Sequence, residues 1–236
     1  MTTIKSISPI DGSDYAERAV MTPDAAKAAV ARAKAAQPAW AALPLAERRD
    51  TVLAGIAALN GMKERVVADL AWSMGRPTRW GGEFSGVNER ANYMASIAET
   101  ALAPLVTEDS DRFERRIERA PMGVVFVIAP WNYPYLTALN TIVPALIAGN
   151  AVMLKAASQT LLTGEIIAEA MHAGGVPVDI FQNIVLDHAG TEALIAARAF
   201  GFVNFTGSVA GGQAIERAAA GKIGRASCRE RVLQVV

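Results

Sequence analysis

The sequence contains only one cysteine and two histidines among its 236 residues, and this scarcity limits the chemistry that it can support. A single cysteine excludes an internal disulfide framework and suits a reducing compartment, so we expect a cytoplasmic protein. Without clustered cysteines, and with only His172 and His188 to offer imidazole, we expect no metal site.

An excess of either charge is also missing, because 23 acidic side chains balance 23 basic ones. No broad field therefore attracts nucleic acid or an anionic membrane surface, and we expect neither as a partner. The first residues lack the apolar segment of a secretory signal. The most apolar stretch, residues 122–154, contains PWNYP, whose prolines and asparagine argue against a continuous membrane-spanning helix.

The apolar residues before residue 122 mostly follow helical spacing. A Thr-Pro pair is a typical cap and first-turn combination, while glycine and proline stop helices. This half therefore predicts a mostly helical segment. We expect helices from Thr22 to Pro38, from about Leu45 to Gly75 with an interruption at Gly61, and over residues 84–102.

The sequence DRFERRIERA, residues 111–120, has a different pattern in which Phe113 and Ile117 alternate with charged residues. Alternation of this kind is typical of a strand that is exposed on one side. We therefore expect an amphipathic hairpin strand within residues 107–120.

From residue 123 onward, short apolar runs alternate with helical segments. The runs GVVFVIA, AVMLK, FQNIV and FVNFT are typical of buried parallel strands. Strand and helix alternate four times, which predicts an α/β fold with a doubly wound parallel, Rossmann-like sheet. We expect helices near residues 135–149, 161–173, 190–199 and 208–220, and an incomplete Rossmann-like region over residues 123–222 that follows the helical segment and hairpin strand of residues 1–122.

Polar loops follow the first, second and fourth of these strands, at the edge where doubly wound sheets bind ligands. Ser208 opens a helix whose free N–H groups attract an anion such as a pyrophosphate, and Gly207 permits close backbone approach. Taken alone, Ser208 is an ordinary N-cap, Asn132 a turn residue and Lys155 a solvated charge. Their occurrence together at three strand ends predicts a binding site.

These stretches resemble the aldehyde dehydrogenase superfamily. APWNYPYLTALNTIVPALIAGNAVMLKAASQT is similar to its Pro-Trp-Asn-aromatic-Pro loop, Pro-Ala-Leu-x-Ala-Gly-Asn segment and lysine strand, while FVNFTGSVAGGQAI resembles its Phe-Thr-Gly-Ser-x-x-x-Gly turn. SPIDGS resembles its Asn-Pro-x-x-Gly opening. The resemblance covers roughly residues 4–222, and is greatest to succinate-semialdehyde dehydrogenase-like members. It implies a homo-oligomeric oxidoreductase that converts a small-molecule aldehyde to a carboxylic acid with NAD or NADP.

The resemblance also implies roles for particular residues. Asn132 would donate its side-chain amide to an oxyanion, and Trp131 would form a wall of the cofactor pocket. Lys155 would contact the adenosine ribose region, while Gly207 and Ser208 would hold the pyrophosphate. The implied cofactor-binding residues are Ile128, Pro130, Trp131, Asn132, Lys155, Ser158, Thr206, Gly207, Ser208 and Gly212, the last of which would allow tight helix packing.

One departure from the family pattern concerns the cofactor. Family members usually have proline after the lysine and then, two residues later, glutamate, whereas this chain has Ala156 and Ser158. A glutamate repels a ribose 2′-phosphate, and serine removes that repulsion, so we expect NADP to be used at least as well as NAD. The alternative is that Ser158 only caps the helix that begins around Thr160.

The family chemistry needs a cysteine thiolate that attacks the aldehyde and a glutamate from a Glu-Leu-Gly-Gly motif. No such motif follows Ala220, and the context of Cys228 does not match the family's cysteine. We therefore expect an N-terminal fragment that lacks the catalytic domain and is inactive. The alternative from another class is a non-catalytic nucleotide-binding or scaffolding protein. A short-chain type of hydride-transfer enzyme is disfavoured, because an early Gly-x-x-x-Gly-x-Gly turn and a Tyr-x-x-x-Lys pair are missing.

Two further expectations concern segments at the edges of this pattern. The DRFERRIERA strand resembles the family's oligomerisation hairpin, and we expect its partner strand to come from a missing C-terminal segment, which would leave an aggregation-prone edge. Codons for residues 223–232, IGRASCRERV, can be chosen to match a widely used short-read sequencing adapter. We therefore expect the authentic gene to end at about Lys222 and residues 223–236 to be non-native. A reactive cysteine and an ordinary divergent tail are the alternatives.

Overall fold

The computed structural model describes residues 2–220, and the backbone of residues 225–229 and 234–235. A six-stranded sheet lies at its centre, and four neighbouring pairs of its strands are parallel. The chain order of these parallel strands, with the first strand in the middle, is that of a doubly wound sheet, which confirms the predicted α/β fold. The strands lie in the order β10 (Gln234–Val235), β9 (Arg225–Arg229), β8 (Phe202–Thr206), β5 (Val124–Ile128), β6 (Ala151–Lys155) and β7 (Phe181–Asn183).

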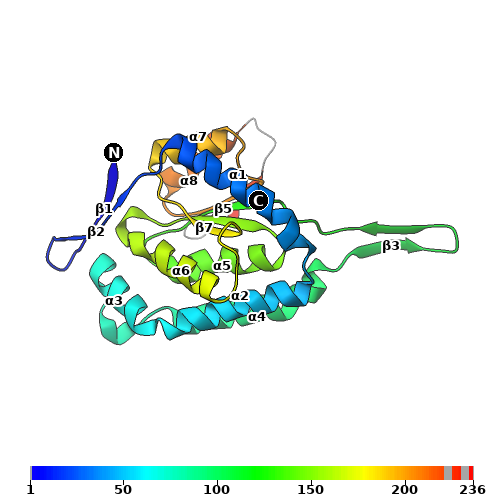
Figure 1. Cartoon of the computed structure of the whole chain (residues 1–236), viewed down its shortest axis with the longest axis horizontal. Coiled ribbons are helices and arrows are strands. Elements are labelled where there is room, and N and C mark those ends of the chain that lie inside the picture. The colour runs from blue at the N-terminus through cyan, green and yellow to red at the C-terminus, as the bar shows by residue number, and fades with distance from the viewer. Residues whose placement is uncertain (1, 221–224, 230–233, 236) are drawn as a thin grey trace.

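Helices cover both faces of this sheet (Figure 1). The segments after β5 and β6 form α5 (Pro134–Ile147) and α6 (Leu161–Ala173), which lie on one face. The opposite face is covered by α1 (Pro23–Ala42), α7 (His188–Ala196) and α8 (Val209–Ala219). An outer layer packs on α5 and α6, and it consists of α2 (Leu45–Gly61), α3 (Lys63–Met74), the short 3-10 helix η1 (Thr78–Trp80) and α4 (Phe84–Leu102).

Most of the predicted helices in the N-terminal half are confirmed. The Thr22 hydroxyl caps α1 by accepting a hydrogen bond from the Ala25 N–H at 3.2 Å. The predicted interruption at Gly61 separates α2 from α3, and Gly75, with a φ of 72°, ends α3 in the left-handed conformation that glycine favours.

The prediction that the first helix ends at Pro38 is wrong, since α1 continues to Ala42. Pro38 lacks an N–H group and so removes one helical hydrogen bond. The extra turn, however, buries Trp40, whose indole N–H donates to the Leu146 carbonyl at 2.9 Å. Burial of this large side chain against α5 offsets the lost bond.

A hairpin at the N-terminus was not predicted. It consists of β1 (Thr3–Ile7) and β2 (Asp14–Ala19), and the SPIDGS segment turns between them. The Ser6 hydroxyl donates to the Gln159 carbonyl at 2.5 Å, and the Gln159 amide donates to the Ile7 carbonyl at 2.8 Å. The hairpin therefore lies against η2 (Ser158–Thr160), the 3-10 helix that follows β6.

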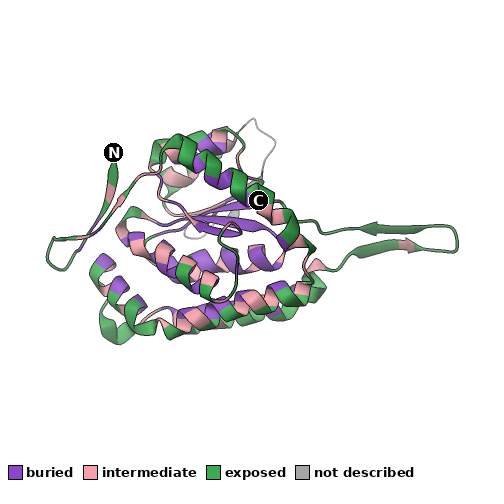
Figure 2. Ribbon diagram, in the orientation of Figure 1, coloured by how far each residue is buried: buried purple, intermediate pink, exposed green. Residues whose placement is uncertain are grey.

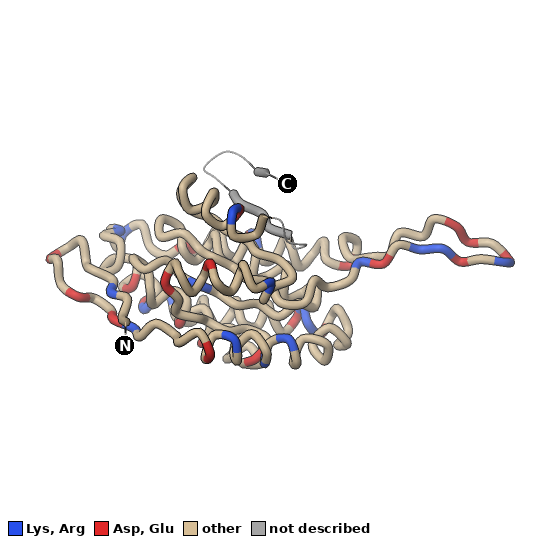
Figure 3. Tube along the Cα trace, turned by 90° about the horizontal axis from the view of Figure 1, so that it is seen from above, with Lys and Arg blue, Asp and Glu red and all other residues tan. Residues whose placement is uncertain are grey.

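The predicted strand forms β4 (Glu114–Ile117), which pairs with β3 (Leu105–Asp109) immediately upstream. A further partner strand from a missing C-terminal segment stays a prediction. The short separation of the two strands makes this local pairing the easier one to form. The hairpin projects from the body (Figure 1), is almost entirely exposed (Figure 2) and has charges of both signs (Figure 3). Its exposed apolar side chains are Leu105, Val106, Phe113 and Ile117.

Helices α2 and α6 approach each other closely at two glycines. A Cβ atom on Gly174, which ends α6, would lie 2.1 Å from the backbone nitrogen of Gly55 in α2. A Cβ atom on Gly55 would lie 2.8 Å from the sulfur of Met171. This crossing attaches the outer helical layer to the sheet domain, so it needs residues without side chains.

We expect Gly174→Ala to lower the free energy of unfolding by about 1–3 kcal/mol, because the new methyl group meets backbone rather than a movable side chain. Gly61→Ala is the matched control, since nothing lies within 4 Å of its added Cβ. The control should be neutral or stabilising by up to about 1 kcal/mol. Urea titration of both variants measures the difference, and equal stabilities would contradict the close crossing.

Candidate functional site

Three strand ends meet at one edge of the sheet. The Cα atom of Ile128, the last residue of β5, is in register with Lys155 of β6 on one side and with Phe205 of β8 on the other. The Ala129 N–H also donates to the Lys155 carbonyl at 3.1 Å. The structure thus brings the loops that begin at these strand ends together, as the spacing of the motifs predicted.

The N-terminus of α8 has two N–H groups without helical acceptors. Ser208 is the N-cap, and its hydroxyl accepts from the Gly211 N–H at 3.2 Å, so the ordinary capping role is confirmed. This cap does not use the N–H groups of Val209 and Ala210, which precede the first helical hydrogen bond. Together with the helix dipole, they suit an anion.

Two glycines flank the ring of Phe205 at this helix start. A Cβ atom on either Gly207 or Gly211 would lie 2.6 Å from the end of the ring. A side chain at either position would have to displace this half-buried ring. The sequence predicted close backbone approach to a ligand at Gly207, whereas the structure shows contact with Phe205, and it did not single out Gly211. Thr206 and Gly207 are half-buried, whereas Ser208 is exposed.

Lys155 is buried rather than solvated, since only 9% of its surface is exposed. Burial lowers the pKa of its ammonium group, and the Asp187 carboxylate opposes this effect. Among the described residues, the ammonium group has no hydrogen-bond partner. Asp187 is itself engaged, because it caps α7 by accepting from the Gly190 N–H at 2.7 Å. A buried cation at the edge of the sheet therefore lacks an acceptor.

Ser158 lies three residues beyond, at the start of η2, and is exposed. The alternative that it caps the following helix is not supported, because α6 has Thr160 as its N-cap and no side-chain capping bond. The 3-10 helix itself has no such bond either. Within the described part of the chain the Ser158 hydroxyl has no partner, so it is available to a ligand that reaches this strand end.

Asn132 is in the exposed loop between β5 and α5. Its side-chain oxygen accepts from the Tyr133 N–H at 3.1 Å, and its carbonyl accepts from the Arg76 guanidinium at 2.7 Å. The side-chain NH₂ group has no partner among the residues that the structure describes, so it remains a free donor. Ile128 and Pro130 are buried at the start of the loop, while Trp131 is 55% exposed.

Two charged residues that the sequence did not point to support this loop. Arg76 forms an ion pair with Glu83 at 2.7 Å, and Glu83 accepts from the Leu136 N–H at 2.6 Å. Burial raises the pKa of Glu83, and hydrogen bonds from Leu136 and Arg76 act in the opposite direction. An acidic residue immediately before a helix is a common sequence feature, so no signal pointed to its contact with α5.

A buried carboxylate also lies beside α5. Asp69 of α3 accepts from the Tyr135 hydroxyl at 3.0 Å and from the Thr163 hydroxyl at 3.3 Å. Burial raises the pKa of Asp69, and these two hydrogen bonds counter that effect. Because Tyr135 is the second residue of α5, this cluster holds the helix start from the side of the outer layer.

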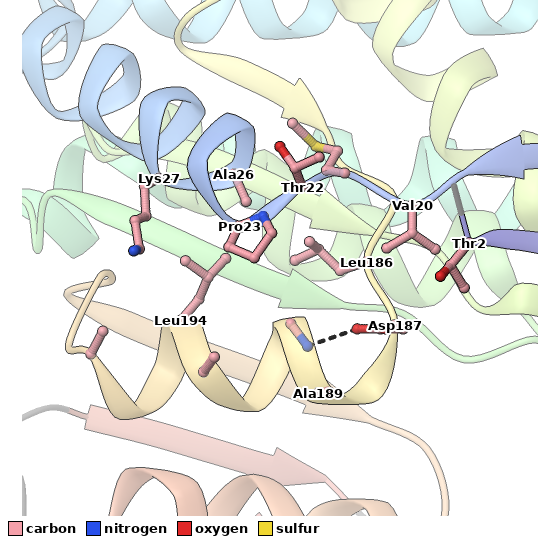
Figure 4. A pocket seen from close by; sticks show the side chains of 14 residues that line it. Thr2, Val20, Thr22, Pro23, Ala26, Lys27, Leu186, Asp187, Ala189 and Leu194 are labelled. Atoms are coloured by element: carbon pink, nitrogen blue, oxygen red, sulfur yellow. Dashed lines mark hydrogen bonds between the residues drawn. The ribbon is translucent and has the colours of Figure 1, made fainter.

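A cavity of about 490 Å³ lies elsewhere, between the start of α1 and α7 (Figure 4). Apolar residues such as Val20, Leu186 and Leu194 form much of its wall. None of the predicted site residues lines it, although its wall includes Asp187, the carboxylate that acts on Lys155. Among residues 2–220, no helix is long and apolar enough to cross a membrane. The described residues also include no group of three or more metal-ligating His, Cys, Asp or Glu side chains.

The predicted non-native tail is only partly described. The predicted boundary at Lys222 lies outside the described residues. The backbone of Cys228 is in β9, opposite Phe205. Neither observation tests the origin of residues 223–236, which stays a prediction.

Comparison with known proteins agrees with this arrangement. The family model described as "Aldehyde dehydrogenase family" matches residues 1–229. N-succinylglutamate 5-semialdehyde dehydrogenase 1 of Caulobacter vibrioides is 34% identical over 216 residues, which are 91% of this chain and 46% of that protein. The chain spans about half the length of the curated relatives it matches.

Solved structures show the same likeness. A NAD-dependent benzaldehyde dehydrogenase from Corynebacterium glutamicum has a TM-score of 0.89 at 27% identity, over 96% of this chain and 50% of that one. A NADP-dependent glyceraldehyde-3-phosphate dehydrogenase from Bacillus halodurans, complexed with NADP, has a TM-score of 0.88 at 27% identity, over 96% of this chain and 49% of that one. NAD and NADP are therefore both named as cofactors among the structural relatives.

We expect Lys155→Met to raise the thermal unfolding temperature at pH 7, because methionine fills similar space without a buried charge. The folded-state pKa of Lys155 lies below the unfolded value of 10.5, so the unfolded chain binds the proton more tightly. The wild-type chain therefore gains stability as pH rises from the lowered pKa toward 10.5, and its difference from the variant should shrink. Calorimetry of both proteins from pH 7 to pH 10.5 measures this. A constant difference would contradict a buried, destabilised ammonium group.

Proposed function

Since the chain belongs to the aldehyde dehydrogenase family, we propose that it binds NAD or NADP and stabilises an oxyanion in the oxidation of an aldehyde to a carboxylic acid. The single observation that supports this most directly is the register of Ile128 with both Lys155 and Phe205. That register places the asparagine loop, the lysine and the anion-attracting start of α8 at the same edge of the sheet.

The residues present fit a dinucleotide. The N–H groups of Val209 and Ala210, which have no acceptor among the described residues, would donate to the pyrophosphate oxygens, beside the exposed Ser208. The buried Lys155, which has no hydrogen-bond acceptor among the described residues, would bond the adenosine ribose region. When bound, the nicotinamide would supply a hydride acceptor, and the remaining steps would fall to protein groups.

The side-chain amide of Asn132 would act on the substrate. A carbonyl oxygen gains negative charge when a nucleophile attacks its carbon, and a fixed N–H donor stabilises that charge. The Asn132 NH₂ group is a suitable donor because its own oxygen is already bonded to the Tyr133 N–H. The sequence lacks a Glu-Leu-Gly-Gly motif, and its one cysteine, Cys228, does not match the family context. We therefore propose that residues 1–236 alone do not turn over aldehydes.

The substrate, assembly and location are proposed on the same basis. A small aliphatic aldehyde or semialdehyde agrees with the succinylglutamate semialdehyde named for the Caulobacter relative. The exposed apolar side chains of the β3–β4 hairpin, such as Phe113 and Ile117, favour contact with another subunit in a homo-oligomer. The single cysteine favours a cytoplasmic location.

Asn132 can be tested in a chimaera that joins residues 1–220 to the C-terminal half of the Caulobacter relative, which restores a nucleophile. We expect Asn132→Ala to lower kcat by about 10²–10³, with little change in nucleotide affinity, because the amide acts mainly where charge develops. Stopped-flow and steady-state assays of NADPH formation measure kcat in both chimaeras. Residues 1–236 alone serve as the inactive reference. A normal kcat in the variant would reduce Asn132 to a turn residue.

Cofactor choice can be tested in the chain itself by fluorescence titration with NADP and NAD. We expect the wild-type chain to bind NADP at least as tightly as NAD, because Ser158 leaves room for a 2′-phosphate without repelling it. Ser158→Glu should shift the ratio of the two dissociation constants toward NAD by roughly tenfold or more, since repulsion in a partly exposed site is worth about 1–3 kcal/mol.

Ser158→Gln is the matched control for this experiment, since it adds the same bulk without the charge. If the glutamine and glutamate variants shift the ratio equally, side-chain size rather than charge decides the preference, and the proposed role of Ser158 is lost.

A further inference from the structure

The loop that contains Asn132 is held by two charged residues from the outer helical layer. Arg76 lies between α3 and η1, and Glu83 immediately precedes α4. Both are largely withdrawn from solvent, with side-chain exposures of 14% for Arg76 and 2% for Glu83. Neither belongs to the sheet domain that presents the three strand ends.

Glu83 replaces the missing cap of α5. The N-cap residue of this helix, Tyr133, makes no side-chain capping bond, and Pro134 at the first position has no N–H group. The next two backbone donors belong to Tyr135 and Leu136. The Leu136 N–H donates to the Glu83 carboxylate at 2.6 Å, and a hydrogen bond from the Tyr135 N–H also favours the charged form of Glu83. A carboxylate at a helix N-terminus also interacts favourably with the helix dipole. Glu83 therefore fixes where α5 begins.

Arg76 holds the residues just before that helix start. One guanidinium nitrogen donates to Glu83 at 2.7 Å, and another donates to the Asn132 carbonyl at 2.7 Å. The guanidinium carbon also lies 4.9 Å from the centre of the Tyr133 ring. Only a planar group with several fixed donors can make these contacts at once, and lysine cannot reproduce them.

These contacts leave Asn132 little rotational freedom. Its carbonyl is bound to Arg76, and its side-chain oxygen is bound to the next backbone N–H. We propose that Arg76 and Glu83 are positioning residues that set the direction of the free Asn132 NH₂ group, an inference that rests on the proposed oxyanion role of Asn132. The ion pair acts on the reaction only through that amide.

A purely structural role is the competing explanation. In that case the ion pair would only attach α4 to α5, and any cation that neutralises Glu83 would serve. The two explanations differ for Arg76→Lys, which keeps the charge next to Glu83 but cannot also hold the Asn132 carbonyl and the Tyr133 ring. Lysine should restore stability in both cases, but it should restore the order of Asn132 only if the role is structural.

The experiment is ¹⁵N relaxation on the full chain, read at the Asn132 side-chain amide and the Tyr133 backbone amide. In the wild type we expect order parameters (S²) near 0.85 at both amides, which indicate a rigid loop. In Arg76→Met and in Arg76→Lys we expect order parameters below about 0.6 at both positions. Glu83→Gln, which keeps an acceptor for Leu136 but loses the ion pair, should also loosen Asn132. Thermal unfolding should show Arg76→Lys close to the wild type.

The matched control is Arg79→Met, which removes the same charge from η1, where Arg79 is exposed and contacts Trp80. It should leave both amides rigid. An Asn132 amide that is equally ordered in Arg76→Lys and in the wild type would overturn the proposal. So would an amide that is already mobile in the wild type.

NADP titration of the same samples keeps the two proposals separate. If NADP shifts no resonance of the α8 start, the proposed function fails, whatever the mobility of Asn132. If NADP binds but Asn132 stays rigid in the Arg76 variants, only the positioning role fails.

Discussion

Strand β5 pairs with β6 and β8 at once, and the position of every loop at the ligand-binding edge depends on this double pairing. Its five residues are all buried, because helices cover both faces of the sheet. A shift of one residue would turn each side chain toward the opposite helical layer, so the register is strongly specified. The same register sets Ile128 and Lys155, which end β5 and β6, level with Phe205, the last residue but one of β8.

Around this apolar frame, the structure contains several charged groups that burial makes costly. Lys155 lies at the sheet edge, while Glu83 and Asp69 contact the first turn of α5. Burial lowers the pKa of Lys155 and raises the pKa of Glu83 and of Asp69, so in each case it favours the neutral form. Such groups concentrate at functional sites, where a fixed charge or hydrogen bond serves binding or catalysis and is retained although it lowers the stability of the fold. Here they border the loops of β5 and β6, which suits a binding edge on a rigid sheet.

Parts of the fold could be predicted because their signals are local. Short apolar runs identified β5, β6, β7 and β8. Every residue of β5 and β6 is buried, whereas β8 buries only Val203. The N-terminal hairpin was missed because the segment TIKSI buries only one of its residues. The extension of α1 past Pro38 was missed because it depends on the distant contact between Trp40 and Leu146.

The sequence by itself determined the α/β fold and the three polar loops, because glycine, proline and serine act on their immediate neighbours. Only the tertiary structure decided which of their residues are buried, joined or free. Lys155 loses its solvent when helices cover the strand end. Arg76 contacts Asn132, 56 positions later, because the outer helical layer packs on α5. For the same reason Glu83 contacts Leu136, 53 positions later. Such contacts join distant parts of the chain, and no local pattern encodes them.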